Sequence, residues 1–206
     1  MHFSHSMQHI PRPFSADHGY EVRQFFAADG EEIQSFVAAV AGSSPYLKGL
    51  IEKEHQWLRG AFAQPDAALE VELSNLKVTA ARDLMSALRR AKRRVALWTA
   101  LCDLAGVWAL EEVTEALSKF ADLACQMSLN HALKVQLQRG KIPTRKPETD
   151  PAELGMFVLA MGKLGANELN YSSDIDLICF FDESYFASVD VFEARAGFIR
   201  ATKNMV

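Results

Sequence analysis

Two short apolar runs separated by a glycine-containing turn constrain the fold of this 206-residue chain more than any other feature. Residues 156–161 (MFVLAM) have the length and the β-branched or aromatic content of a buried strand. The run ends at residues 162–165 (GKLG), whose two glycines allow a tight turn and a close approach of the backbone to a ligand. We therefore expect a short helix over residues 166–169 and a second strand over residues 175–181.

Two aspartates stand at the start of the second predicted strand, Asp174 and Asp176. Because strand side chains alternate between faces, both carboxylates are expected on the same face. Two neighbouring carboxylates give no packing advantage, and they repel each other unless a cation lies between them. Mg²⁺ prefers oxygen ligands and is typically held by one or two carboxylates together with phosphate oxygens. The pair therefore predicts a magnesium site.

The glycine turn supplies groups that a phosphate needs next to such an ion. Free backbone N–H groups at Gly162 and Gly165 and the positive charge of Lys163 neutralise phosphate oxygens. The hydroxyls of Ser172 and Ser173 either bond the same phosphates or cap the turn. Together these groups predict phosphoryl or nucleotidyl transfer, which proceeds mainly by positioning and charge stabilisation.

The string GKLGANELNYSSDIDLI over residues 162–178 combines these features in one motif. A lone D-x-D or a lone Gly-Lys turn is a weak signal, but their combination at this spacing is specific. The string resembles the signature of the bifunctional glutamine synthetase adenylyltransferase/adenylyl-removing enzyme family, within the polymerase-β-like nucleotidyltransferase superfamily. A fainter likeness extends over residues 88–106.

The resemblance implies an activity and its partners. Members of that family contain two nucleotidyltransferase domains: the first removes AMP from a tyrosine of glutamine synthetase by phosphorolysis, and the second attaches AMP from ATP. The form ELNYSSDIDL after mostly helical sequence is similar to the first, adenylyl-removing copy. The implied substrates are a nucleotide (ATP or ADP) and phosphate, with Mg²⁺ as the metal. The implied partners are glutamine synthetase and a nitrogen-signalling regulatory protein.

The resemblance also assigns roles to residues of the motif. Six positions match it, two catalytic metal ligands and four that orient nucleotide phosphates: Asp174 and Asp176, and Gly162, Lys163, Gly165 and Ser173. Glu168 is expected to brace the short helix rather than to take part in the chemistry.

The predicted fold class is α+β and mostly α, with an N-terminal helical bundle before an incomplete polymerase-β-like nucleotidyltransferase sheet. We expect a disordered tail over residues 1–19, a helical region over 20–140, a linker over 141–152 and the start of the catalytic domain over 153–206. The periodicity of apolar residues predicts helices over these ranges: 20–40 with a break near residue 30, 46–58, 66–105, 110–139 and 189–206.

Local signals predict where these helices begin and end. Ser44 suits an N-cap and Pro45 the first helical turn, while Gly106 and Gly140 each follow a helix. Arg145 and Lys146, in the linker, would approach the phosphate if the linker folded over the site.

The predicted sheet is incomplete. Asp182 and Glu183 are the only nearby candidates for a third metal carboxylate, and both follow the strand's apolar core. Superfamily members generally take that ligand from a later strand, whereas here a helix follows. Two strands are marginal as an independent sheet. We therefore expect the N-terminal portion of a longer protein, inactive on its own.

Five cations within residues 89–94 form the densest charge run. Since they surround much of a helix, we expect a solvated face with acidic neighbours; the alternative is that one or two of these arginines reach a phosphate or an acidic partner. His2, His5 and His9 have helical spacing, but no carboxylate or cysteine completes a metal site, so they are interpreted as part of the polar tail.

Composition excludes several classes of protein. The net charge of −4 argues against nucleic-acid binding through bulk positive charge, and no stretch of about 18 apolar residues predicts a membrane span. Three isolated cysteines, Cys102, Cys125 and Cys179, are expected to be reduced and buried, as in a cytoplasmic protein.

Two other functions remain open from the sequence. One is a nucleotidyltransferase that acts on a different substrate, against which the helical N-terminal region and the ELNYSS form argue. The other is a helical interaction module whose site is inert.

Overall fold

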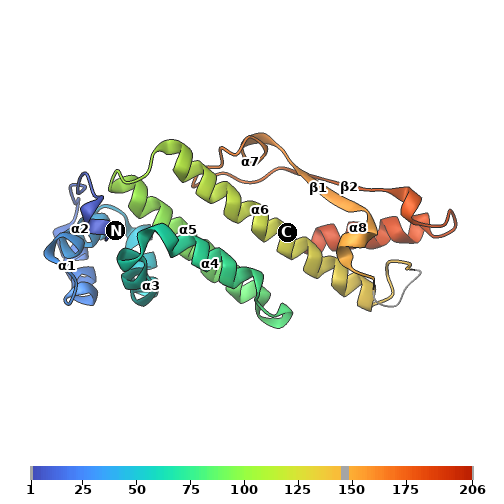
Figure 1. Cartoon of the computed structure of the whole chain (residues 1–206), viewed down its shortest axis with the longest axis horizontal. Helices are drawn as coiled ribbons and strands as arrows, with labels where there is room; N and C mark the ends of the chain where they lie inside the picture. Colours follow the sequence, from blue (N-terminus) through green and yellow to red (C-terminus); the bar gives the residue numbers. More distant parts are fainter. Residues whose placement is uncertain (1, 145–148, 206) are drawn as a thin grey trace. The chain divides into compact units, whose positions relative to one another are not determined.

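A computed structural model describes residues 2–144 and 149–205 of the chain (Figure 1). The chain divides into two compact units, Met1–Phe120 and Ala121–Val206, and the division falls within helix α6 (Leu110–Gln138). Helices dominate, and the strands of the described residues form one two-stranded antiparallel sheet. The prediction of a mostly helical α+β chain is confirmed.

The described residues of the N-terminal unit form five complete α-helices and the first part of α6. The complete ones are α1 (Ala16–Arg23), α2 (Glu31–Ser43), α3 (Pro45–Ala63), α4 (Ala68–Lys77) and α5 (Leu84–Leu104). Short 3₁₀ turns connect them: η1 (Phe3–His5), η2 (Gln24–Phe26), η3 (Pro65–Ala67) and η4 (Ala81–Asp83). None of the described helices is both long enough and apolar enough to cross a bilayer.

Local helix signals behave as predicted. The Leu47 N–H donates to the Ser44 hydroxyl at 3.3 Å, and Pro45 is the first residue of α3. Gly106 and Gly140 follow α5 and α6 with φ of +67° and +62°, the left-handed conformation that glycine adopts without strain.

The single helix predicted over residues 66–105 is wrong, because the chain breaks between α4 and α5. Val78 and Thr79 are β-branched and weak helix formers. The Thr79 hydroxyl donates to the carbonyl of Asn75 at 3.1 Å and offers the backbone an alternative to continued helix.

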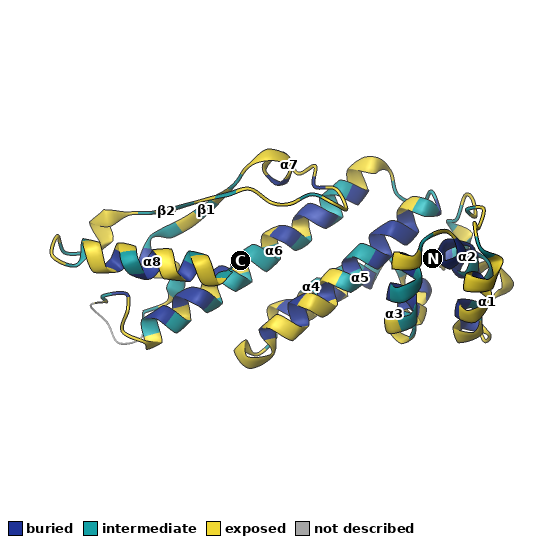
Figure 2. Ribbon diagram, turned by 180° about the vertical axis from the view of Figure 1, so that it is seen from behind, coloured by how far each residue is buried: buried dark blue, intermediate teal, exposed yellow. Residues whose placement is uncertain are grey.

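Residues 2–15 differ from the predicted disordered tail because they pack on the N-terminal unit. Phe3 is fully buried, and its ring lies 5.1 Å from that of Phe62 and 5.2 Å from that of Trp98. The Gln8 N–H donates to the carbonyl of Ala105 at 2.9 Å. Figure 2 shows the buried positions of the helices that form this core.

The C-terminal unit packs a small sheet against helices. It includes the remainder of α6, then η5 (Pro151–Leu154), β1 (Met156–Ala160), α7 (Gly162–Gly165), β2 (Leu177–Phe181), η6 (Glu183–Tyr185) and α8 (Val191–Met205). The strands pair antiparallel, from Met156 opposite Phe181 to Ala160 opposite Leu177. The apolar core is formed by these residues of α6, the connecting segments and α8: Leu129, Ala132, Leu133, Ile142, Leu154, Ala194, Phe198 and Ala201.

The sheet has one half-buried face and one exposed face, so the prediction of a fully buried first strand is wrong. Alternate residues of both strands are exposed, and Phe157 and Phe180 stack on the outer face with ring centroids 5.3 Å apart. Figure 2 shows this alternation along β1 and β2. The reason is that, within the described residues, helices of the unit cover only the face that includes Met156, Val158 and Phe181.

Other predictions for the chain need smaller corrections. Of the three cysteines, only Cys102 is buried, whereas Cys125 and Cys179 are half-buried; all three are free thiols. The predicted linker over 141–152 includes the buried Ile142 and the start of η5. Arg145 and Lys146 lie outside the described residues, so the structure does not address their predicted approach to a phosphate.

Candidate active site

The glycine turn begins immediately after β1. Gly162 has φ of +56°, and α7 starts at this residue rather than at Ala166 as predicted. The helix is short because Asn167 adopts φ of +60° and ends it. The Gly165 N–H donates to the Met161 carbonyl at 3.0 Å, which closes the turn on the end of the strand.

Gly165 is required by a close approach of two backbone segments. A Cβ at this position would collide with the carbonyl oxygen of Ala160 in β1. Only glycine permits that contact, so the sequence G-K-x-G determines how tightly α7 folds back on the strand.

Asp176 lies directly beside the turn. The Met161 N–H donates to the backbone carbonyl of Asp176 at 2.9 Å, one residue beyond the last paired residues of the sheet. A Cβ at Gly162 would lie 3.3 Å from Oδ2 of Asp176. The structure thus brings together Asp176 and Gly162, two of the residues that the sequence predicts for the site.

Asp174 and Asp176 precede β2 rather than belonging to it, since the strand begins at Leu177. Both are exposed, and neither carboxylate forms a hydrogen bond or ion pair with another described residue. They are available oxygen ligands at the end of the sheet where α7 also lies (Figure 1).

Ser173 is oriented by its own loop. Its hydroxyl donates to Oδ1 of Asn170 at 2.6 Å, and the Ser172 N–H reaches the same oxygen at 3.3 Å. Of the two roles predicted for these serines, this bonding corresponds to capping the turn. Sequence reasoning missed Asn170, although an Asn before two serines is a known signal for a side-chain-capped turn.

Lys163 and Glu168 flank the turn with exposed side chains. The Glu168 N–H donates to the Lys163 carbonyl at 2.8 Å, so the backbone of Glu168 closes α7. The Lys163 ammonium group is left accessible on the same turn as Gly162.

A profile of the glutamate-ammonia ligase adenylyltransferase family matches residues 33–206, which is most of the chain. The chain belongs to this family.

Curated relatives of this adenylyltransferase family agree with the assignment. Three of them bear the name bifunctional glutamine synthetase adenylyltransferase/adenylyl-removing enzyme. The protein of Bradyrhizobium sp. (strain ORS 278) is 40% identical over 176 residues, that of Rhodopseudomonas palustris (strain TIE-1) 38% over 180 residues, and that of Agrobacterium fabrum 33% over 184 residues. The alignments cover 82%, 84% and 84% of this chain. They cover only 18%, 18% and 19% of the relatives, so the chain spans about a fifth of their length.

Adenylyltransferases use nucleotides, and the Mg²⁺ predicted for them can be tested against the ligands that the chain supplies. Within residues 2–144 and 149–205, no group of three or more His, Cys, Asp or Glu side chains is placed to hold a metal ion. Mg²⁺ needs only one or two carboxylates when phosphate oxygens and waters complete its shell. Asp174 and Asp176, both exposed and without a described partner, fit that requirement.

Asp182 and Glu183 do not lie where a third ligand is needed. Asp182 Oδ1 accepts from the Ser184 N–H at 2.8 Å and caps η6. Asp182 is at the opposite end of β2 from Asp176, about 20 Å away at the usual rise of a strand. This geometry is consistent with the expectation that the third ligand comes from a later strand.

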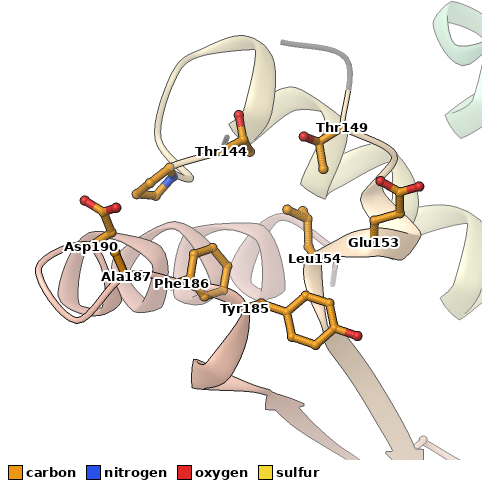
Figure 3. Close-up of a pocket in the computed structure, with 9 residues that line it drawn as sticks. Thr144, Thr149, Glu153, Leu154, Tyr185, Phe186, Ala187 and Asp190 are labelled. Carbon is orange, nitrogen blue, oxygen red and sulfur yellow. The ribbon is translucent and has the colours of Figure 1, made fainter. Parts of the chain in front are cut away.

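The cavity shown in Figure 3 is separate from the candidate site. It measures about 190 Å³ and is lined by residues such as Glu153, Leu154, Tyr185 and Asp190. These belong to the end of the sheet at which Gly155 bonds Asp182. With two carboxylates and no cation among its lining residues, the cavity is unsuited to phosphate.

The basic run lies in the N-terminal unit and has the acidic neighbours that were expected. Glu54 and Glu72 are both 5% exposed. Arg93 Nη2 and Arg94 Nε each lie 2.8 Å from Glu54, and Arg94 Nη1 lies 2.8 Å from Glu72. Burial lowers the pKa of Arg94, but its bonds to the two glutamates outweigh this effect and raise the pKa overall. Arg93 and Arg94 are therefore structural.

Proposed function

We propose that the C-terminal unit begins the adenylyl-removing nucleotidyltransferase domain of a glutamine synthetase adenylyltransferase. In this reaction, phosphate attacks the phosphorus of the AMP on a modified tyrosine of glutamine synthetase. The bond from phosphorus to the tyrosyl oxygen breaks, ADP leaves and free tyrosine is restored. The contact between Asp176 and the Gly162 turn supports the proposal most directly, because it joins the two halves of the motif.

The proposed roles follow from the position of each side chain. Asp174 and Asp176 would hold Mg²⁺, which adds positive charge to the phosphoryl oxygens. Gly162 and Gly165 allow the backbone N–H groups of the turn to approach a phosphate, and Lys163 adds a positive charge there. The Asn170 bond holds the Ser173 hydroxyl in the loop just before Asp174, which orients the acidic segment.

The fixed backbone of the site contributes to rate as well as to binding. The Met161–Asp176 hydrogen bond connects the end of β1 to the residue before β2, so the turn and the acidic segment are held together before substrate arrives. Preorganised charges of this kind stabilise a phosphoryl-transfer transition state without reorganising during the reaction.

The test uses a full-length family member that contains this chain, with adenylylated glutamine synthetase and phosphate as substrates. Asp174→Asn and Asp176→Asn should each lower ADP release on the order of 100-fold or more. Asp182→Asn, at the other end of β2, should leave the rate unchanged. Undiminished ADP release by both variants, or release of a product other than ADP, would overturn the assignment and favour a different nucleotidyltransferase substrate.

We also propose that residues 1–206 alone are inactive. Phe157, Leu159, Ile178 and Phe180 leave the outer face of the sheet between 43% and 51% exposed, which is typical of a sheet that further structure covers. Two strands are in addition marginal as an independent sheet. ADP release by the 206-residue chain at the rate of the full-length protein would contradict this proposal.

Glutamine synthetase is the proposed partner, on the strength of the relatives' names. A nitrogen-signalling regulator as second partner and a cytoplasmic location remain predictions from the family resemblance. Pull-down of glutamine synthetase by the full-length protein, and its loss on deleting residues 153–206, would test the first of these.

A further inference from the structure

A groove lined by basic residues lies in the C-terminal unit, between the end of α6 and the second half of α8. It measures about 300 Å³. Its lining consists of one buried amide, four cations and one exposed amide: Gln136, Arg139, Lys141, Arg200, Lys203 and Asn204. No residue of the candidate active site is among them.

The charge of this groove is unbalanced. Arg139, Lys141, Arg200 and Lys203 are all exposed, and none forms an ion pair with another described residue. The lining contains no carboxylate among the described residues, although the chain as a whole has a net charge of −4. Four cations converging on one groove repel each other, and a bound anion relieves that repulsion.

Helix ends alone do not explain the arrangement. Cations are favoured near helix C-termini, which accounts for Arg139 after α6 and Lys203 in the last turn of α8. Lys141 and Arg200 need another reason. Arg200 Nη2 donates to the Lys141 carbonyl at 3.3 Å, and this bond joins the two cationic residues across the groove.

Gly197 allows this approach. A Cβ at Gly197 would collide with the carbonyl oxygen of Lys141, so α8 packs directly on the backbone that follows α6. The spacing between Lys141 and Arg200 is therefore set by close backbone packing rather than by two free surface side chains.

Gln136 provides a second, independent observation. It is 2% exposed and lines the groove, but its side-chain amide forms no hydrogen bond with another described residue. A buried amide without a partner costs about 1–3 kcal/mol. A ligand oxygen in the groove would accept from this amide while the cations neutralise its charge.

We propose that this groove binds a small oxyanion with two or more negative charges, of the phosphoryl or carboxylate class. Arginine and lysine bind both classes through charge-assisted hydrogen bonds. The site is distinct from the glycine turn and does not depend on the function proposed above.

Calorimetric titration of the 206-residue chain tests the proposal, at constant ionic strength and with EDTA to remove divalent metals. The probes are inorganic pyrophosphate and citrate, which separate the phosphoryl from the carboxylate source. Saturable binding of either probe is expected. Arg200→Gln and Lys141→Gln should each weaken it about tenfold, the value of one charge-assisted bond.

Two control variants distinguish binding in this groove from binding to general surface charge or to the glycine turn. Arg195→Gln removes an exposed cation of α8 that does not line the groove, and Lys163→Gln removes the cation of the glycine turn. Both should bind the probe within about twofold of the unmodified chain. Equal weakening by Arg195→Gln, loss of binding in Lys163→Gln, or the absence of saturable binding would each overturn the proposal.

Gln136→Leu tests the floor of the groove. Leucine has a similar size and no polar group, so this variant should unfold at the same temperature as the unmodified chain or higher. It should still weaken probe binding several-fold. Unchanged binding in a folded Gln136→Leu variant would contradict the assignment of Gln136 to the site.

Discussion

The carboxylate of Asp176 lies against the Cα of Gly162, where a Cβ would be only 3.3 Å from Oδ2. The two residues are 14 positions apart in the chain, and the hydrogen bond from Met161 to Asp176 holds them together. A glycine is needed at this position for two reasons, its φ of +56° and the neighbouring carboxylate. The stability and the geometry of the site therefore depend on the same residue.

Gly162→Ala should cost about 1–2 kcal/mol of unfolding free energy, because of its left-handed backbone conformation. It should also lower ADP release by the full-length protein, because the methyl group displaces Asp176. Gly140→Ala is the matched control, since Gly140 has φ of +62° with no atom within 4 Å of its Cβ position. Urea unfolding should show similar losses for both variants, and only Gly162→Ala should lose activity. Equal activity of the two would show that the Asp176 contact is unimportant.

Gly165→Ala should destabilise the C-terminal unit, because its Cβ would collide with the Ala160 carbonyl and the backbone of β1 has little freedom to move. Gly49→Ala provides the contrast. Gly49 lies inside α3 with open space at its Cβ position, so alanine there should stabilise by about 0.5–1 kcal/mol. Thermal unfolding of the two variants should shift in opposite directions; a shift in the same direction would contradict the packing of α7 on β1.

Phe3→Ala should cost about 3–5 kcal/mol, since Phe3 is fully buried among aromatic rings of the N-terminal unit. Phe14→Ala is its control, because Phe14 is 97% exposed and should change stability by less than about 0.5 kcal/mol. Denaturation followed by the fluorescence of Trp98 measures both. If the two variants were equally stable, residues 2–15 would be the free tail that the sequence predicts.

Glu54→Ala should cost about 3–5 kcal/mol, because it leaves Arg94 partly buried with one of its two carboxylate partners removed. Glu115→Ala removes an exposed pair with Lys119 and should cost less than about 1 kcal/mol. Chemical denaturation at low and high salt separates the two pairs, as salt should reduce only the effect of Glu115→Ala. A salt-sensitive loss in Glu54→Ala would indicate a solvated pair instead.

Asp182 should contribute stability that depends on pH. The hydroxyl and the backbone N–H of Ser184 hold the pKa of Asp182 below its usual value. A lowered pKa in the folded state gives stability above the unfolded pKa of about 3.9, and this stability is lost as pH falls through the folded pKa. The stability difference between the unmodified chain and Asp182→Asn should be constant from about pH 7 to pH 5 and should shrink below about pH 4. A difference independent of pH would contradict the ionised cap.

Sequence reasoning predicted the parts of the candidate site better than their arrangement. The G-K-x-G turn and the S-D-x-D segment were found as neighbours in the chain, and the structure joins them through Asp176 and Gly162. The position of α7 was wrong by four residues, because the left-handed conformation of Asn167 follows from loop geometry rather than from apolar periodicity. The exposed outer face of the sheet was missed for a similar reason, since apolar content predicts a strand but not which of its faces is covered.

The sequence by itself determined the family, the mostly helical composition, the cap at Ser44 and the helix ends at Gly106 and Gly140. These features depend on neighbouring residues, whose backbone preferences and hydrogen bonds act over a few positions. Only the tertiary structure decided that Phe3 is in a core, that Arg94 bonds Glu54 and Glu72, and that Lys141 meets Arg200. Those contacts join residues 22 to 95 positions apart. Nothing in the local pattern specifies them, because they arise from the packing of whole helices.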